Sequence, residues 1–188
     1  IKEYIDLIQE TKRLCTIPII ASINCFSSSE WTDFARTMQD AGADALELNI
    51  LSLQTEKEYQ YGAFEQRHID ILSSVKKHVS IPVIIKLGTN LTSAQVPQID
   101  YAISGGVHDG KAMVKAILAG ASAVEVCSVI YQKGENFIES MTEELSEWMK
   151  KQGYNTISEF KSEMNALSTG ESNPFERTQF MKYFSSKE

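Results

Sequence analysis

Small and polar residues follow two successive apolar runs in the second half of the chain. Gly105 and Gly106 end the run YAISGG, and Cys127 and Ser128 end the run AVEVCS. Bare backbone at two consecutive strand ends lets N–H groups approach a phosphate closely, especially where a helix begins soon afterwards. The same glycines also fit a plain tight turn, so the residues alone leave both interpretations open.

A lysine interrupts the apolar run IPVIIKLG at position 86. A buried ammonium group is costly unless an anion or a strong acceptor lies beside it. Lysines at strand ends serve as Schiff-base nucleophiles, as phosphate ligands, or as partners of an electron-rich cofactor. The structural alternative for Lys86 is an ion pair with Glu47 on the neighbouring strand.

Polar residues also follow the two earlier apolar runs. Ser22 and Asn24 end the first, and Asn49, with Ser52 beyond it, ends the second. An asparagine can hold an amide-like ring because it donates and accepts hydrogen bonds at once. Asn49 and Ser52 also fit ordinary loop positions.

The elements that carry these residues alternate along the chain. Apolar runs predict strands at 17–24, 44–50, 81–88, 101–106 and 123–128, and periodic patterns predict helices at 2–14, 65–79 and 109–119. Another helix should begin at a capping box formed by Ser27 and Glu30 and end near Gly42. Strands that alternate with helices predict a parallel α/β fold, with 17–24 covered on both faces.

The tail has helical patterns only. A long amphipathic helix carries Phe137, Met141, Leu145 and Trp148 and should end at Gly153. Two shorter helices are expected in TISEFKSEM and NPFERTQFMKYF. Packing is the simplest role for all three.

The connection between 81–88 and 101–106 is too short for an ordinary crossover helix. Five predicted strands also fall short of the eight in a closed (β/α)₈ barrel, which usually has about 250 residues. We therefore expect segments to be absent near Ser93 and before Ile1, with a chain break between Lys86 and Asp100. An unusual open sheet is the alternative.

Composition excludes several function classes. Eighteen basic and 25 acidic residues give a net charge of −7, which disfavours nucleic acid or an anionic membrane as a partner. No apolar run approaches the roughly 20 residues of a membrane span. Three widely spaced cysteines indicate neither a disulfide framework nor a metal site, and fit a reducing cytoplasm.

Several segments, in order and over nearly the whole chain, resemble the dihydroorotate dehydrogenase family, in particular its dihydroorotate dehydrogenase-like bacterial branch. They are PIIASIN, AGADALELNI, IPVIIKLG, ISGGVHDGKAMVKAILAGASAVEVCSVIYQKG and FERTQFMKY. The resemblance implies a (β/α)₈ TIM barrel that holds FMN at its C-terminal mouth and oxidises dihydroorotate to orotate in pyrimidine biosynthesis. It implies one FMN-binding barrel domain over 1–188, with the C-terminal helices of 135–184 packed on it.

The resemblance also implies roles for individual residues. Gly105, Gly106, Cys127 and Ser128 match the backbone cradle for the FMN phosphate. Lys86 matches the lysine beside the N1 and O2 edge of the flavin, where positive charge stabilises the reduced anionic flavin.

The substrate side departs from the family pattern. Ser22 matches a polar flavin contact, and Asn49 matches an asparagine that touches flavin and substrate. Ser52 occupies the position of the catalytic base, but Leu53 replaces the family's proline and Gln54 its second asparagine. A serine is a poor base unless its proton can leave through water or a neighbour.

Two function classes follow. The first is an FMN-dependent oxidoreductase in which Ser52 takes a proton from a substrate C–H while hydride passes to the flavin. It would use dihydroorotate or an analogue and an electron acceptor, with a homodimer as a candidate assembly. The second is a phosphate-binding TIM-barrel lyase, aldolase or synthase in which Lys86 forms a Schiff base. A flavin spectrum supports the first class, and borohydride trapping of substrate on Lys86 supports the second.

Overall fold

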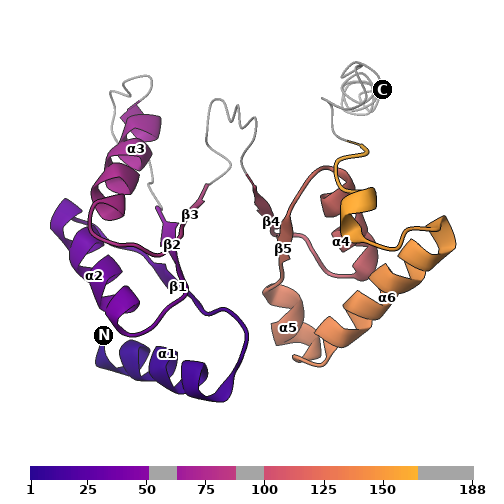
Figure 1. Ribbon diagram of the computed structural model, residues 1–188, viewed down its shortest axis with the longest axis horizontal. Coiled ribbons are helices and arrows are strands. Elements are labelled where there is room, and N and C mark those ends of the chain that lie inside the picture. The colour runs from indigo at the N-terminus through magenta and orange to yellow at the C-terminus, as the bar shows by residue number, and fades with distance from the viewer. Residues whose placement is uncertain (51–62, 88–99, 165–188) are drawn as a thin grey trace, which may run out of the picture. The chain divides into compact units, whose positions relative to one another are not determined.

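The structure is a computed structural model that describes residues 1–50, 63–87 and 100–164. It divides into two compact units, Ile1–Gln95 and Val96–Glu188. Each unit combines parallel strands with helices, so the predicted α/β class is confirmed (Figure 1).

The first unit contains a parallel sheet with the strand order β1-β2-β3. Its elements are α1 (Lys2–Leu14), β1 (Ile20–Ile23), α2 (Ser28–Asp40), β2 (Ala45–Asn49), α3 (Ala63–Lys76) and β3 (Val83–Lys86). The helix over 2–14 is confirmed to the residue. The three strands lie inside the predicted ranges and are shorter, because the backbone ladder ends before the apolar runs do.

Helix α2 begins as its sequence predicts. The Ser27 side chain accepts a hydrogen bond from the Glu30 N–H, and the Glu30 carboxylate accepts one from the Ser27 N–H. These bonds satisfy amides that the first helical turn leaves without partners. Gly42 follows the helix with a φ of +100°, a conformation that favours glycine.

The core of the first unit lies on one face of the sheet. Leu46 and Leu48 of β2 are fully buried there, together with Trp31, Ala35 and Met38 of α2. The opposite face is more open, since Ile20 of β1 is 52% exposed. The prediction that 17–24 is covered on both faces is therefore wrong for the described residues: exposed and buried side chains alternate along β1, as in a sheet packed on one side.

The second unit contains a shorter parallel pair of strands and more helix. Its elements are β4 (Ala102–Ser104), α4 (Gly110–Leu118), β5 (Ala123–Glu125), α5 (Ser128–Lys133), α6 (Phe137–Gln152) and the single 3₁₀ turn η1 (Ile157–Glu159). Leu145 of α6 packs with Val114 and Ile117 of α4 and with Phe160. Gly153 ends α6 in the left-handed conformation, as predicted.

Two predictions in the second unit need correction. The strand over 123–128 ends at Glu125, because β4 offers no partner beyond Ser104, and helix α5 begins at Ser128. TISEFKSEM forms only the η1 turn and further turns, not a helix. Ser162 takes a φ of +70° there, which a right-handed helix cannot continue through.

The described strands form a three-stranded and a two-stranded sheet, and they do not close into a barrel. The segment 88–99, in which we expected a chain break, lies outside the described residues, and so does NPFERTQFMKYF.

Candidate functional site

Four polar residues share the open face of the first sheet. The parallel register aligns Ser22 with Glu47, and Asn49 with Lys86. Glu47 and Asn49 are two positions apart on β2, so their side chains point to the same side. Ser22, Glu47, Asn49 and Lys86, hereafter the polar cluster, therefore occupy one face near the carboxyl ends of three neighbouring strands.

Glu47 is the centre of this cluster. The Ser22 hydroxyl donates a hydrogen bond of 2.7 Å to Glu47 Oε1, and Lys86 Nζ lies 3.9 Å from the same oxygen. The Glu47 side chain is only 12% exposed, whereas that of Lys86 is 40% exposed. The ion pair that the sequence offered as the structural alternative for Lys86 is thus present.

Ser22 is held by its backbone as well as by its side chain. The Tyr4 hydroxyl of α1 donates to the Ser22 carbonyl oxygen at 3.1 Å and accepts from the Ser22 N–H at 2.9 Å. These bonds satisfy the free edge of β1 and connect the strand to α1. The Ser22 hydroxyl takes no part in these backbone bonds and donates to Glu47.

The sequence indicates Glu47 only as a partner of Lys86. One feature of the sequence points to Glu47 itself. It is a lone acidic residue between Leu46 and Leu48, both of which are fully buried. Asn49 is half-buried at the end of β2. Ser52, Leu53 and Gln54 lie outside the described residues.

Gly105 and Gly106 follow β4 directly and both have positive φ values, +87° and +72°. A Cβ built on either residue has no heavy atom within 4 Å among the described atoms. The backbone at this strand end is therefore open to a ligand, and its conformation disfavours residues other than glycine.

Cys127 and Ser128 are exposed and lie beyond the end of β5. Cys127 is the N-cap residue of α5, and Ser128 is its first residue. Ser104 and Glu125 are register partners, so the glycine pair and the Cys127–Ser128 pair both leave the carboxyl ends of neighbouring parallel strands. Strand β5 ends earlier than predicted, at Glu125, but Gly105–Gly106 and Cys127–Ser128 still lie at this edge of the sheet.

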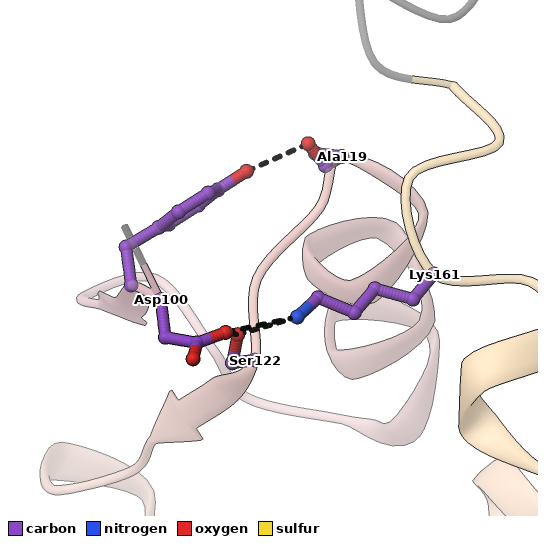
Figure 2. A network of polar contacts seen from close by, with 5 residues as sticks. Asp100, Ala119, Ser122 and Lys161 are labelled. Atoms are coloured by element: carbon purple, nitrogen blue, oxygen red, sulfur yellow. Dashed lines mark hydrogen bonds and ion pairs between the residues drawn. The ribbon is translucent and has the colours of Figure 1, made fainter. Parts of the chain in front are cut away.

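A separate polar network lies at the opposite ends of these strands (Figure 2). Lys161 Nζ donates to the Ser122 hydroxyl at 2.6 Å and lies 3.3 Å from Asp100 Oδ1, which also accepts from Ser122 at 2.5 Å. The Ser122 hydrogen bond, followed by Lys161, lowers the pKa of Asp100. Close by, the Tyr101 hydroxyl donates to the Ala119 carbonyl oxygen at 2.7 Å.

This network connects the starts of β4 and β5 to the chain after η1. Amino ends of parallel strands contribute to stability more often than to chemistry in α/β folds. Lys161 and its partners are accordingly structural.

Other candidate groups carry less chemistry. Burial, followed by the charge of Glu30, raises the pKa of the Cys25 thiol to about 11, so the thiol is not an activated nucleophile at neutral pH. In the described ranges, no three His, Cys, Asp or Glu side chains are grouped so that they could hold a metal ion. None of the helices in those ranges is long and apolar enough to cross a bilayer.

Comparison with curated proteins points to one kind of enzyme. The chain is 24% identical to the catalytic subunit of dihydroorotate dehydrogenase B (NAD(+)) from Thermoplasma volcanium, in an alignment that covers 84% of this chain and 70% of that one. That alignment spans 216 positions, more than the 188 residues of this chain, so the relative has residues that this chain lacks. No family model matches the chain.

Shorter matches agree with the longer one. Over 71 residues the chain is 31% identical to dihydroorotate dehydrogenase (fumarate) from Lachancea kluyveri and 32% identical to probable dihydroorotate dehydrogenase A (fumarate) from Enterococcus faecalis. Each of these matches covers 38% of this chain and 23% of the relative. The chain that carries the polar cluster and the glycine pair is a relative of the dihydroorotate dehydrogenases, which are oxidoreductases.

Proposed function

We propose that this protein is an FMN-dependent oxidoreductase of the dihydroorotate dehydrogenase type, which oxidises dihydroorotate to orotate. The observation that carries the proposal is the polar cluster, which gathers Ser22, Asn49 and Lys86 at the carboxyl ends of three parallel strands in a chain related to these enzymes. Carboxyl ends of parallel strands are where α/β proteins bind ligands.

The polar cluster suits the ring of FMN. Lys86 Nζ would lie beside the N1 and O2 edge, and the Asn49 amide can donate and accept at the same time. Ser22 would supply a further polar contact. When bound, FMN supplies the hydride acceptor, while these residues orient the ring and counter the charge that develops on it.

The glycine pair suits the FMN phosphate. Gly105 and Gly106 expose backbone where no described atom would meet a Cβ, and Cys127 and Ser128 leave the adjacent strand. Backbone N–H groups at such strand ends can hold phosphate oxygens. The polar cluster thus supports the proposal for the flavin ring, and the glycine pair supports it separately for the phosphate.

The remaining parts of the proposal follow from this assignment. Ser52 is the proposed base, which takes the substrate proton and passes it to water or a neighbour. The complete fold would be a (β/α)₈ barrel to which 1–188 contributes as one domain, with the helices of 135–184 packed on it. An electron acceptor would reoxidise the flavin. The acidic composition and the three free cysteines support a cytoplasmic location, and a homodimer is the proposed assembly.

The test is an absorbance spectrum of the purified protein, followed by anaerobic addition of dihydroorotate. We expect bound FMN and bleaching of its visible absorbance on addition of the substrate. A protein that binds no FMN would overturn the proposal. Bound FMN that dihydroorotate does not bleach would keep the flavoprotein assignment and reject this substrate.

A further inference from the structure

We propose that the Glu47 carboxylate, held beside Lys86, lowers the preference of the site for reduced over oxidised flavin. The inference rests on the proposed function, because it concerns FMN bound at the polar cluster. It assigns a functional role to a residue that the sequence indicates only as an ion-pair partner of Lys86.

The geometry fixes the Glu47 carboxylate beside the lysine. Oε1 accepts the 2.7 Å hydrogen bond from Ser22 and is the oxygen that lies 3.9 Å from Lys86 Nζ. The Ser22 backbone is held in turn by Tyr4. Because the Glu47 side chain is only 12% exposed, solvent screens its charge less than it would on an open surface.

Glu47 and Lys86 are the two charged residues of β1, β2 and β3. The other side chains on the same face of these strands are Ile20, Ser22, Ala45, Asn49 and Ile84. The three strands therefore present one positive and one negative charge, with a sum of zero. A ligand that approaches Lys86 meets the field of both charges.

The two redox states of FMN respond differently to that field. The oxidised ring is uncharged, whereas the reduced ring at neutral pH carries a negative charge near N1, the edge proposed to face Lys86. Lys86 attracts this charge and Glu47 repels it, so the pair stabilises the anion less than the lysine would alone. Glu47 thus makes the bound flavin easier to reoxidise.

The experiment compares the affinity of the apoprotein for oxidised FMN and for FMN reduced beforehand with dithionite, in anaerobic titrations. Glu47→Gln keeps the side-chain size and an oxygen that can accept from Ser22, but removes the charge. We expect the ratio of the reduced to the oxidised affinity to rise about tenfold in this variant, the size of effect that a nearby partly buried charge has on an equilibrium. The midpoint potential should become more positive accordingly.

Two further variants separate this role from a structural one. Glu47→Asp keeps the charge and should leave the affinity ratio near the wild-type value. Glu10→Gln makes the same change of charge in an exposed pair with Arg13 on α1 and should not alter the ratio. Circular dichroism of each variant shows whether it has folded.

The outcomes distinguish this inference from the proposed function. Wild type that binds no FMN overturns both. If wild type binds FMN and Glu47→Gln weakens both redox states equally, Glu47 is only structural and the inference is wrong while the function stands. The same conclusion follows if Glu47→Asp changes the ratio as much as Glu47→Gln does.

Discussion

Lys86 shows how one charged residue in a strand acquires a partner. Its 40% exposed side chain lies 3.9 Å from Glu47, so the ammonium group is neither fully buried nor free in solvent. Such a partly exposed pair contributes little to stability by itself. Its position on the open face near the carboxyl end of β3 supports the proposed role of the lysine in ligand binding.

Substitutions of Ser52 and Lys86 should impair different properties of the protein if both residues act in the proposed reaction. Ser52→Ala should keep bound FMN and slow flavin reduction by dihydroorotate on the order of 10²-fold, the usual share of a general base. Lys86→Ala should weaken FMN binding as well, because Glu47 would then face the flavin without its counter-charge. Anaerobic stopped-flow absorbance, together with the flavin content of each purified variant, separates the two effects. Wild-type reduction rates in Ser52→Ala would remove that serine from the mechanism.

At the scale of elements, the turn after β4 depends on two consecutive glycines with positive φ. An L-residue in this conformation is strained by about 1–2 kcal/mol. A side chain there would also enter the open space beside the backbone. The turn is thus the most sensitive part of the proposed phosphate site.

Gly105→Ala and Gly106→Ala should each lower FMN retention at least tenfold and leave a folded protein, because the added Cβ would occupy space that the phosphate needs. Flavin content and circular dichroism measure the two properties. The matched control is Gly153→Ala at the end of α6, where the glycine has a similar φ of +84° and similar open space. Equal flavin content in all three variants would mean that Gly105 and Gly106 do not bind the FMN phosphate.

The start of the first sheet carries a pH-dependent contact. Hydrogen bonds from the Ile19 N–H, followed by Lys12, hold the pKa of Asp44 below its ordinary value. A carboxyl group whose pKa is lower in the folded state stabilises the fold above its unfolded pKa, roughly 3.9, and this contribution is lost as pH falls through the folded value.

Asp44→Asn should therefore lower the urea midpoint at pH 7, and the difference from wild type should shrink as pH falls below about 4 and the Asp44 carboxylate takes up a proton. Urea unfolding at several pH values measures this. Asp6→Asn on the exposed side of α1 is the control for charge alone. A difference that stays constant down to pH 2 would mean that the Asp44 charge is not involved.

At the scale of the whole molecule, binding of the proposed FMN should appear as a change in the stability of the native state. A ligand that binds the native state alone stabilises it by about 2.7 kcal/mol at a free concentration of 100 times Kd. For a chain of 188 residues this corresponds to a Tm increase of roughly 5–10 °C.

We expect calorimetry of the apoprotein to show this increase when FMN is added, and a smaller one with riboflavin, which lacks the phosphate. Equal shifts with FMN and riboflavin would contradict the role of the glycine pair. The absence of any shift with FMN would contradict cofactor binding as a whole.

The local structure could be predicted from the sequence alone. Helical periodicity and capping residues placed α1, the start of α2 at Ser27 and the end of α6 at Gly153, since each of these depends on residues within one or two turns. Alternation of strands and helices determined the parallel α/β class. It also placed the site residues near strand ends, because the carboxyl ends of parallel strands share one edge.

The contacts between elements depend on how the whole chain packs. The pairing of Lys86 with Glu47 requires the register of β2 and β3, and the hydrogen bond from Ser22 requires that of β1 and β2; neither register is encoded locally. The end of β5 at Glu125 depends on the length of its partner β4, so the range 123–128, predicted as one strand, contains a strand, a two-residue connection and the first residue of a helix. Lys161 contacts Asp100 and Ser122, which lie about 60 and 40 positions away in the sequence. Residue patterns carry no information over such separations, so only the packing of the chain brings these groups together.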